Sequence, residues 1–244
     1  MSRPSAPITF QAPKHLSVSS IQSYERCPYQ WKQKYVNHRR IDMPAPVVFG
    51  GIFARTMEAL HLGRDAEVYL VKAFAEESER FRNKGLTLAP DVEYAMQLLH
   101  IYQKLPPYQG KPEQSFTLRL PPEFRVPVPL VGYLDLMTAG GVIEMKTSRA
   151  RWTQQRADTE YQAALYAHAF RMMHDREPSE VRYLVFNTNW PDLLELVTHP
   201  GRAELERFGK AAGEMWKHVM AQDFERRCGD CEFCLMDFPR EVAA

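Results

Sequence analysis

The sequence lacks a long hydrophobic run, a glycine-rich phosphate loop and any marked excess of charge. No stretch of 18 apolar residues occurs, so we expect no membrane-spanning helix. Because no phosphate-cradling glycine loop is present, we do not expect a built-in ATP-driven motor. Residues 1–14 contain three prolines and no apolar segment, unlike a secretory signal, and this favours a cytoplasmic protein.

Charge is almost balanced, but basic residues gather in two places. The formal net charge is +1. Residues 1–55 contain eight lysines or arginines, and a second cluster comprises Lys146, Arg149, Arg151 and Arg156. Basic clusters on a nearly neutral protein suit a polyanion such as nucleic acid, although two solvated surface faces are the alternative.

The order of the expected elements indicates an α/β fold. Ser19-x-x-Gln22 has the form of a capping box, and Pro28 is placed to open a second short helix. Hydrophobic periodicity and turn residues predict the remaining elements. Helices are expected at 52–62, 66–83, 91–105, 159–174 and 202–222, and strands at 116–120, 130–137, 142–147, 181–186 and 193–198. We therefore expect a mixed central sheet flanked by helices, with a helical insertion at roughly 50–105.

Two strands joined by Gly140-Gly141 carry the most informative motif. Asp135 ends the stretch Gly132-Tyr-Leu-Asp, and Glu144 and Lys146 lie in Ile143-Glu-Met-Lys-Thr-Ser148. A tight turn centred on the two glycines would place Asp135 opposite Lys146. Since alternate residues of a strand share a face, Asp135, Glu144 and Lys146 should point to one side for any even loop.

Two carboxylates and a lysine on one face can perform phosphodiester hydrolysis. Oxygen ligands from Asp135 and Glu144 suit Mg²⁺ or Mn²⁺, which polarises a phosphodiester and activates water. The Lys146 ammonium can orient the water or neutralise developing charge. A hairpin with an ordinary surface salt bridge is the alternative that the spacing alone leaves open.

These motifs resemble those of the RecB-like PD-(D/E)XK nucleases. The resemblance implies a restriction-endonuclease-like fold over a single domain, residues 1–244, with its nuclease core at roughly 113–200. It implies metal binding by Asp135 and Glu144 and catalysis by Lys146. Gln162 and Tyr166 resemble the family's Gln-x-x-x-Tyr motif, which implies a position near the substrate backbone. The stretch Leu16–Tyr35 resembles the family's N-terminal helix, and Glu113 resembles an acidic residue that precedes the first core strand.

One early motif departs from the family pattern. The family places histidine in Gly-x-x-x-His, whereas Gly51-Ile-Phe-Ala-Arg55 offers an arginine, which cannot bind a metal but can grip a phosphate. His61, six residues further along the helix, is expected to face elsewhere. Arg55, Arg149, Arg151 and Trp152 are the residues expected to contact nucleic acid, with Trp152 placed to stack on bases.

The four cysteines form a separate pattern. Cys228, Cys231 and Cys234 lie within seven residues, and Cys27 lies about 200 residues upstream. Four thiolates suit a [4Fe–4S] cluster or a zinc ion and would join the two ends of the chain as a staple. The layout resembles the iron–sulfur exonuclease group, which includes CRISPR-associated exonucleases and AddB nuclease domains, and this favours the cluster. The gap before the last cysteine is shorter than the group's, which keeps zinc open.

The sequence thus predicts a metal-dependent DNA exonuclease, and the resemblance implies single-stranded ends as the substrate. Recombination, repair, phage DNA processing and CRISPR adaptation are all compatible with these motifs, and a helicase or a recombination or CRISPR protein is a possible partner. The second hypothesis is a catalytically weak DNA-binding module of the same fold. The third is a zinc-stapled interaction protein without a role on nucleic acid.

Overall fold

The computed structural model of the protein describes residues 10–238. By its internal contacts the chain divides into two compact units. The first unit combines Met1–Asp42, Thr117–Gly132 and Glu206–Ala244, and the second combines Met43–Phe116 and Tyr133–Leu205. The four cysteines belong to the first unit, and the residues expected to perform catalysis belong to the second.

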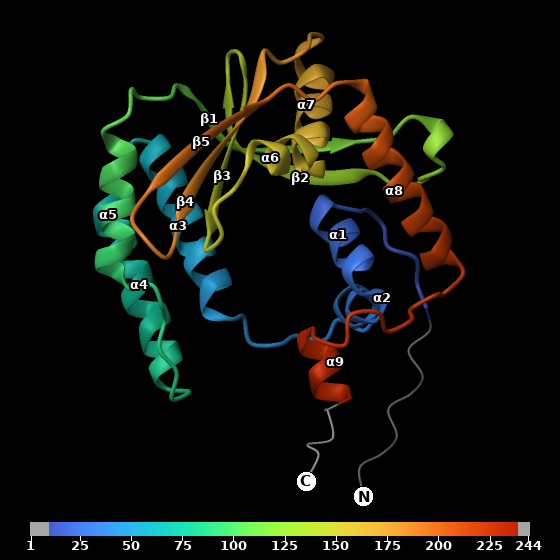
Figure 1. The fold of residues 1–244 in the computed structure, drawn as a ribbon, viewed down its shortest axis with the longest axis horizontal. Coiled ribbons are helices and arrows are strands. Elements are labelled where there is room, and N and C mark those ends of the chain that lie inside the picture. Colours follow the sequence, from blue (N-terminus) through green and yellow to red (C-terminus); the bar gives the residue numbers. More distant parts are fainter. Residues whose placement is uncertain (1–9, 239–244) are drawn as a thin grey trace, which may run out of the picture. The chain divides into compact units, whose positions relative to one another are not determined.

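A mixed five-stranded sheet in the order β1–β2–β3–β4–β5 organises the fold (Figure 1). The strands are β1 (Gly110–Leu118), β2 (Leu130–Thr138), β3 (Gly141–Ser148), β4 (Glu180–Asn187) and β5 (Leu193–Thr198). β2 and β3 are antiparallel, β3 and β4 are parallel, and β4 and β5 are antiparallel. The expected mixed sheet is confirmed, although β1 begins six residues before the expected position.

Helices of the second unit cover both faces of this sheet. On one face, α3 (Ala45–His61), α4 (Ala66–Arg82) and α5 (Val92–Gln103) share a hydrophobic core with the strands, and the Phe53 and Phe186 ring centroids lie 4.7 Å apart. On the other face, α6 (Gln154–Thr159) and α7 (Tyr161–His174) pack Ala163 and Ala167 against Tyr183 and Val185. A parallel β3–β4 pair requires a crossover connection, which these two helices provide.

Two helix starts differ from the expected ones. The helix α1 (Val18–Arg26) is capped by Ser17, not Ser19, and Ser17 forms a reciprocal capping box with Ser20. The helix α3 begins at Ala45, seven residues before the expected start. Proline is tolerated in a first helical turn, so Pro46 does not delay the helix.

The first unit packs helical segments around buried aromatic and cysteine side chains. It contains α1, α2 (Pro28–Trp31), the π-helical turn η1 (Lys32–Val36), the 3₁₀ turn η2 (Pro122–Phe124), most of α8 (Arg202–Met220), and α9 (Glu232–Asp237). Trp31 is fully buried and lies between Tyr35 and Phe224, with centroid separations of 5.4 and 5.8 Å. None of the helices within residues 10–238 combines the length and the apolar character that a bilayer span requires.

Candidate active site

The β2–β3 hairpin brings the expected acidic residues together. Its register pairs Leu136 with Ile143 and Met137 with Val142. Continued by one residue, this register sets Asp135 opposite Glu144, so the expected pairing of Asp135 with Lys146 is wrong by two residues. Because the shift is even, the alternation along the strands still assigns all three side chains to one face.

The turn between the strands explains the shift. The Thr138 hydroxyl accepts hydrogen bonds from the N–H groups of Gly140 at 3.2 Å and Gly141 at 3.0 Å. The turn therefore centres on Ala139–Gly140 and not on the two glycines. Gly141 instead lies in β3, where a Cβ atom would collide with the Glu180 carbonyl oxygen.

Asp135 takes a backbone partner from the neighbouring strand. Its Oδ2 accepts a hydrogen bond from the Met145 N–H at 2.8 Å. Burial raises the pKa of Asp135 well above its usual range, and repulsion by the Glu144 carboxylate raises it further. The Met145 N–H and the Lys146 charge lower this pKa, but by less. A carboxyl group in this environment favours the binding of a proton or a cation.

Glu144 is held by side chains from β3 and α7. It is only 2% exposed, and its Oε1 accepts a hydrogen bond from the Gln162 amide at 2.7 Å. The same oxygen forms an ion pair with the Lys146 ammonium. The Gln162 amide also bonds to the Tyr166 hydroxyl at 2.5 Å. The structure thus brings together Gln162, Tyr166 and the expected catalytic core.

The second oxygen of Glu144 has no such support. Glu144 Oε2 is buried and has no hydrogen-bond partner among the residues that the structure describes. A buried polar atom without a partner lowers the stability of the folded protein, and a bound ion would satisfy it. Glu144 Oε2 is therefore placed to act as a metal ligand.

The two titratable neighbours of Glu144 keep their ordinary protonation states. Burial alone would lower the pKa of Lys146, but the Glu144 carboxylate outweighs it and raises that pKa, so the ammonium stays charged. Burial raises the pKa of Tyr166 well above its usual range, and the negative charges of Glu144 and Asp135 raise it further. Tyr166 is therefore a neutral hydroxyl at physiological pH.

Gly50 allows α3 to approach β3 closely. A Cβ atom on Gly50 would lie 2.9 Å from Thr147 Oγ1, whereas a Cβ atom on Gly51 would have nothing within 4 Å. Gly50 is therefore the glycine that the packing requires. Four residues after it stands Ala54, so the position expected to hold a metal-binding histidine is occupied by alanine and not by Arg55.

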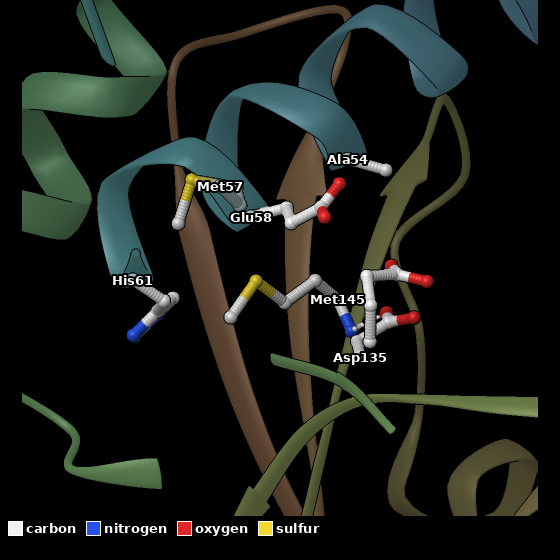
Figure 2. Close-up of a pocket in the computed structure, with 7 residues that line it drawn as sticks. Ala54, Met57, Glu58, His61, Asp135 and Met145 are labelled. Atoms are coloured by element: carbon white, nitrogen blue, oxygen red, sulfur yellow. Dashed lines mark hydrogen bonds between the residues drawn. The ribbon is translucent and has the colours of Figure 1, made fainter. Parts of the chain in front are cut away.

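The lining of a small acidic pocket agrees with Gly50 as the motif glycine, because it includes Ala54 and not Arg55. The pocket is lined by Ala54, Met57, Glu58, His61, Glu113, Asp135 and Met145 (Figure 2). Residues 54, 57, 58 and 61 are spaced as one face of a helix, which α3 directs toward the strands. Figure 2 shows the Glu58 carboxylate on the side of the pocket nearer Asp135. The Glu58 side chain forms no hydrogen bond or ion pair with any residue between 10 and 238.

Arg55 and His61 are both placed differently from their expectations. Arg55 is exposed on α3 and does not line this pocket. His61 does line it, because it lies seven residues after Ala54, or about two helical turns. The His61 Nε2 lies 2.7 Å from the Tyr102 hydroxyl, and burial lowers the pKa of His61, which favours the neutral imidazole.

Glu113 enters the pocket from β1. Its backbone has φ +49°, a left-handed conformation that is uncommon for a residue with a side chain inside a strand. Such conformations persist where the surroundings hold them, often at functional sites. Burial raises the pKa of Glu113, and the charges of Glu58 and Glu144 raise it further. Glu113 therefore belongs electrostatically to the same acidic group.

These residues fit a hard divalent cation. Apart from His61, the donors are carboxylate oxygens, the ligands that Mg²⁺ and Mn²⁺ prefer. Asp135 and Glu144 would hold the ion, and Glu144 Oε2 supplies an otherwise unsatisfied acceptor. Glu58 and Glu113 offer further carboxylates next to Asp135. The arrangement can neutralise a phosphodiester beside a charged lysine, which is the electrostatic requirement of hydrolysis.

The residues expected to contact nucleic acid differ in their exposure to solvent. Arg149 and Arg151 are exposed on the segment that follows β3. Trp152 is only 6% exposed, because its ring packs on Tyr183 and the Arg156 guanidinium covers it at 4.1 Å. This burial corrects the expectation that Trp152 stacks on bases, since neither ring face is open.

The first unit gathers the four cysteines into one site. The sulfur atoms of Cys27, Cys228, Cys231 and Cys234 all lie within 4.8 Å of one another. Cys27 and Cys234 are 3.7 Å apart, and Cys228 and Cys234 are 3.9 Å apart. Cys27 and the C-terminal cysteines thus join the N-terminal and C-terminal segments of this unit.

A salt bridge holds α9 beside the cysteines. The Arg39 guanidinium donates to both oxygens of Asp237, at 2.5 and 3.0 Å, and the Tyr29 hydroxyl donates to Asp237 at 2.7 Å. Burial raises the pKa of Cys27, but the N–H groups of Cys228, Gln30 and Arg227 outweigh it and lower that pKa to about 6. A thiolate is the form that binds metals, so Cys27 is prepared to act as a ligand.

Comparison with known proteins identifies the family. The sequence profile of the PD-(D/E)XK nuclease superfamily matches residues 15–237, and the chain belongs to this superfamily. No protein with curated annotation matches its sequence. A solved structure titled "Crystal structure of SSO0001" shares 13% identity, with a TM-score of 0.42, over 94% of this chain and 86% of that one. The superfamily's nuclease activity and use of divalent metals agree with the acidic pocket.

Sequence reasoning missed Glu58 as a member of the pocket. A signal was available, since Glu58 stands four residues after Ala54 on the helix whose glycine was recognised. Assigning the motif to Gly51 instead of Gly50 shifts the expected ligand position by one residue, which is about 100° around the helix. The expected position is then Arg55 and not Ala54. Only the contact between Gly50 and Thr147 decides between the two frames.

Proposed function

We propose that the protein is a metal-dependent DNA exonuclease that hydrolyses phosphodiester bonds at single-stranded ends. The observation that carries the proposal is the arrangement of Asp135, Glu144 and Lys146, with a buried Glu144 oxygen that lacks a partner. The superfamily supports nuclease chemistry, and the preference for single-stranded ends rests on the resemblance described above.

Each residue has a defined role in this proposal. A bound Mg²⁺ or Mn²⁺ ion supplies neutralisation of the scissile phosphate and activation of the attacking water. Asp135 and Glu144 bind that ion. Gln162 and Tyr166 hold the Glu144 carboxylate in one orientation through their hydrogen bonds. Lys146 keeps a positive charge beside the reacting phosphate.

DNA would reach this site through exposed basic residues. Arg149 and Arg151 follow β3 directly, so they lie only a few residues beyond Lys146. Contacts from Arg149, Arg151 and Arg55 to phosphates would give affinity with little sequence preference. The chain has no motor motif, so any unwinding of duplex DNA would require a helicase or another partner.

The cysteine site is proposed to bind a structural metal. A zinc–sulfur bond of about 2.3 Å places tetrahedral ligands roughly 3.8 Å apart. Two of the sulfur–sulfur separations, 3.7 and 3.9 Å, match this spacing, and all four sulfur atoms lie within 4.8 Å of one another, which supports zinc. The resemblance to iron–sulfur exonucleases favours a [4Fe–4S] cluster, whose cysteines bind different iron atoms and stand further apart. The four cysteines form no disulfide bond, which agrees with a reducing compartment. Iron and zinc analysis of the purified protein decides between the two metals.

Linear and circular single-stranded DNA test the type of cleavage. An exonuclease degrades labelled linear DNA in the presence of Mg²⁺ or Mn²⁺ and spares a closed circle. The variant Lys146→Ala should abolish cleavage but retain DNA binding, since the metal ligands remain. Cleavage of the circle would show an endonuclease, and unchanged cleavage by Lys146→Ala would remove this lysine from the mechanism.

A second candidate is a catalytically weak DNA-binding module of the same fold. Ala54 favours it, because alanine offers no metal ligand at the position that faces Asp135. Tight DNA binding without cleavage in either metal would support this reading.

A further inference from the structure

The turn between β4 and β5 exposes a tryptophan. Trp190 is 46% exposed, whereas Trp31 and Trp152 are buried and Trp216 is half-buried. Within residues 10–238 its ring has no aromatic or cation–π partner. An exposed aromatic ring presents a face on which a planar group such as a nucleic-acid base can stack.

The turn that carries Trp190 is firmly built. The buried Asn187 side chain accepts hydrogen bonds from the N–H groups of Asn189 at 2.8 Å and Trp190 at 3.2 Å. The Asn187 N–H donates to the Asp192 carbonyl at 3.0 Å, which closes the turn. The Tyr94 hydroxyl of α5 bonds to the Asn187 carbonyl at 3.1 Å. Trp190 therefore stands on a fixed backbone, which lowers the entropy cost of binding.

Two hydrogen bonds join this turn to the basic segment after β3. The Thr188 N–H donates to the Ser148 carbonyl at 3.0 Å, and the Asn189 amide donates to the Arg149 carbonyl at 3.1 Å. Because β3 and β4 are parallel and Ser148 pairs with Asn187, both segments leave the sheet at the same edge. Trp190 thus lies beside the backbone that carries the exposed Arg149 and Arg151.

The same edge is close to the proposed catalytic residues. Lys146 precedes Ser148 by two strand residues, which is about 7 Å along β3. A nucleic acid whose phosphate lies at Lys146 would therefore meet this edge within one or two nucleotides. An aromatic ring beside arginines matches the chemistry of a single strand, since each base presents a stacking face and each phosphate a negative charge.

We propose that Trp190, with Arg149 and Arg151, forms a binding site for single-stranded DNA, in which the indole stacks on a base. The inference rests on the proposed nuclease function and names the part of the substrate that lies next to the cleaved bond. Base-paired DNA hides its base faces, so the site favours unpaired nucleotides over a duplex. The burial of Trp152 leaves Trp190 as the tryptophan able to perform this role.

Binding of matched oligonucleotides tests the site. Affinity is measured with a chelator present, so that no cleavage occurs, for a single-stranded oligonucleotide and for the same strand without bases. The wild-type protein should prefer the base-bearing strand. Trp190→Ala should lose roughly 5- to 100-fold of that affinity, while binding of the abasic strand stays unchanged. Trp190→Phe should retain most of the preference, and Leu62→Ala, which removes another exposed apolar side chain, should match the wild type.

Tryptophan fluorescence gives a second readout. Base stacking should quench the wild-type emission, and the quench should disappear in Trp190→Phe although binding persists. The inference is overturned if the wild type binds both strands equally, if Trp190→Ala keeps its base preference, or if Trp190→Phe is still quenched. Because cleavage is not needed, a chain that binds through Trp190 but never cleaves would support this site and contradict the nuclease proposal. Cleavage without any base preference would do the reverse.

Discussion

The half-buried Asp135 carboxyl is a titratable group of the acidic pocket. Its pKa is raised by burial and by the neighbouring Glu144, so the folded protein binds a proton at Asp135 more tightly than the unfolded chain does. Since the folded state then holds more protons, stability without metal should fall as the pH rises above about 3.9, the ordinary value for aspartate. An acidic site of this kind trades stability for the ability to bind a cation.

Asp135→Asn should stabilise the metal-free protein while abolishing cleavage. Asparagine keeps an oxygen for the Met145 N–H but removes the repulsion from Glu144. The gain should be about 1 kcal/mol near neutral pH, or roughly 2–4 °C in Tm, and should shrink toward pH 4. Thermal unfolding with chelator at several pH values measures it. A variant less stable than the wild type at every pH would show that Asp135 is a structural residue.

Glu58→Gln should weaken binding of the divalent cation. Glu58 lines the pocket with Asp135, and its carboxylate has no hydrogen-bond or ion-pair partner in the described part of the chain. Loss of its charge should reduce Mn²⁺ affinity roughly tenfold, measured by calorimetric titration. Glu76→Gln on the exposed side of α4 removes the same charge elsewhere and should leave the affinity unchanged. Equal affinities for both variants would exclude Glu58 from the site.

Among the elements, α3 shows how one close contact positions a site. Gly50 meets Thr147 of β3, and this contact directs Ala54 and Glu58 toward the pocket. A Cβ atom on the adjacent Gly51 would have no other atom within 4 Å. Alanine substitutions at the two glycines therefore make a matched comparison. Both change the helix propensity, but only the one at Gly50 also changes the packing against β3.

Gly51→Ala should stabilise the protein, whereas Gly50→Ala should not. Alanine replaces glycine in a helix interior with a gain of about 1 kcal/mol, and Gly51 has room for the methyl group. At Gly50 the methyl group would lie 2.9 Å from Thr147 Oγ1, so the helix or the threonine must move. Chemical denaturation of both variants measures the difference. Equal stabilisation would mean that the α3–β3 contact is loose.

The elements also show what the sequence could and could not predict. The hairpin face was predictable, because alternation assigns Asp135 and Glu144 to one side for every even loop. Its register was not, because the hydrogen bond that the Thr138 hydroxyl accepts from the Gly141 N–H moved the turn by one residue. The face of α3 was missed for a similar reason, since two adjacent glycines fit the motif equally well. Periodicity predicts which elements exist, and tertiary contacts decide the register of the strands and the face of a helix that points toward the site.

At the scale of the whole molecule, the superfamily match spans residues of both compact units. The acidic pocket and its helices belong to the second unit, and the cysteine site belongs to the first. The cysteines bring together the N-terminal and C-terminal segments of the first unit. A metal bound there closes a loop of about 200 residues, which restricts the unfolded chain.

Cys231→Ser should therefore lower stability and metal content together. Cys231 is buried among the other three sulfurs. Removal of one ligand should cost several kcal/mol if the bound metal supports folding. Iron and zinc analysis alongside thermal unfolding gives the answer. A variant with full metal content and an unchanged Tm would show that Cys231 is not a ligand.

The measurement that tests the central claim most directly is cleavage of end-labelled single-stranded and double-stranded DNA with Mg²⁺ or Mn²⁺. Glu144→Ala and the wild type with chelator are the controls. The account predicts degradation of the single strand from an end, lost in both controls because Glu144 is the metal ligand at the centre of the site. Absence of cleavage in every metal, or cleavage that survives Glu144→Ala, would contradict it.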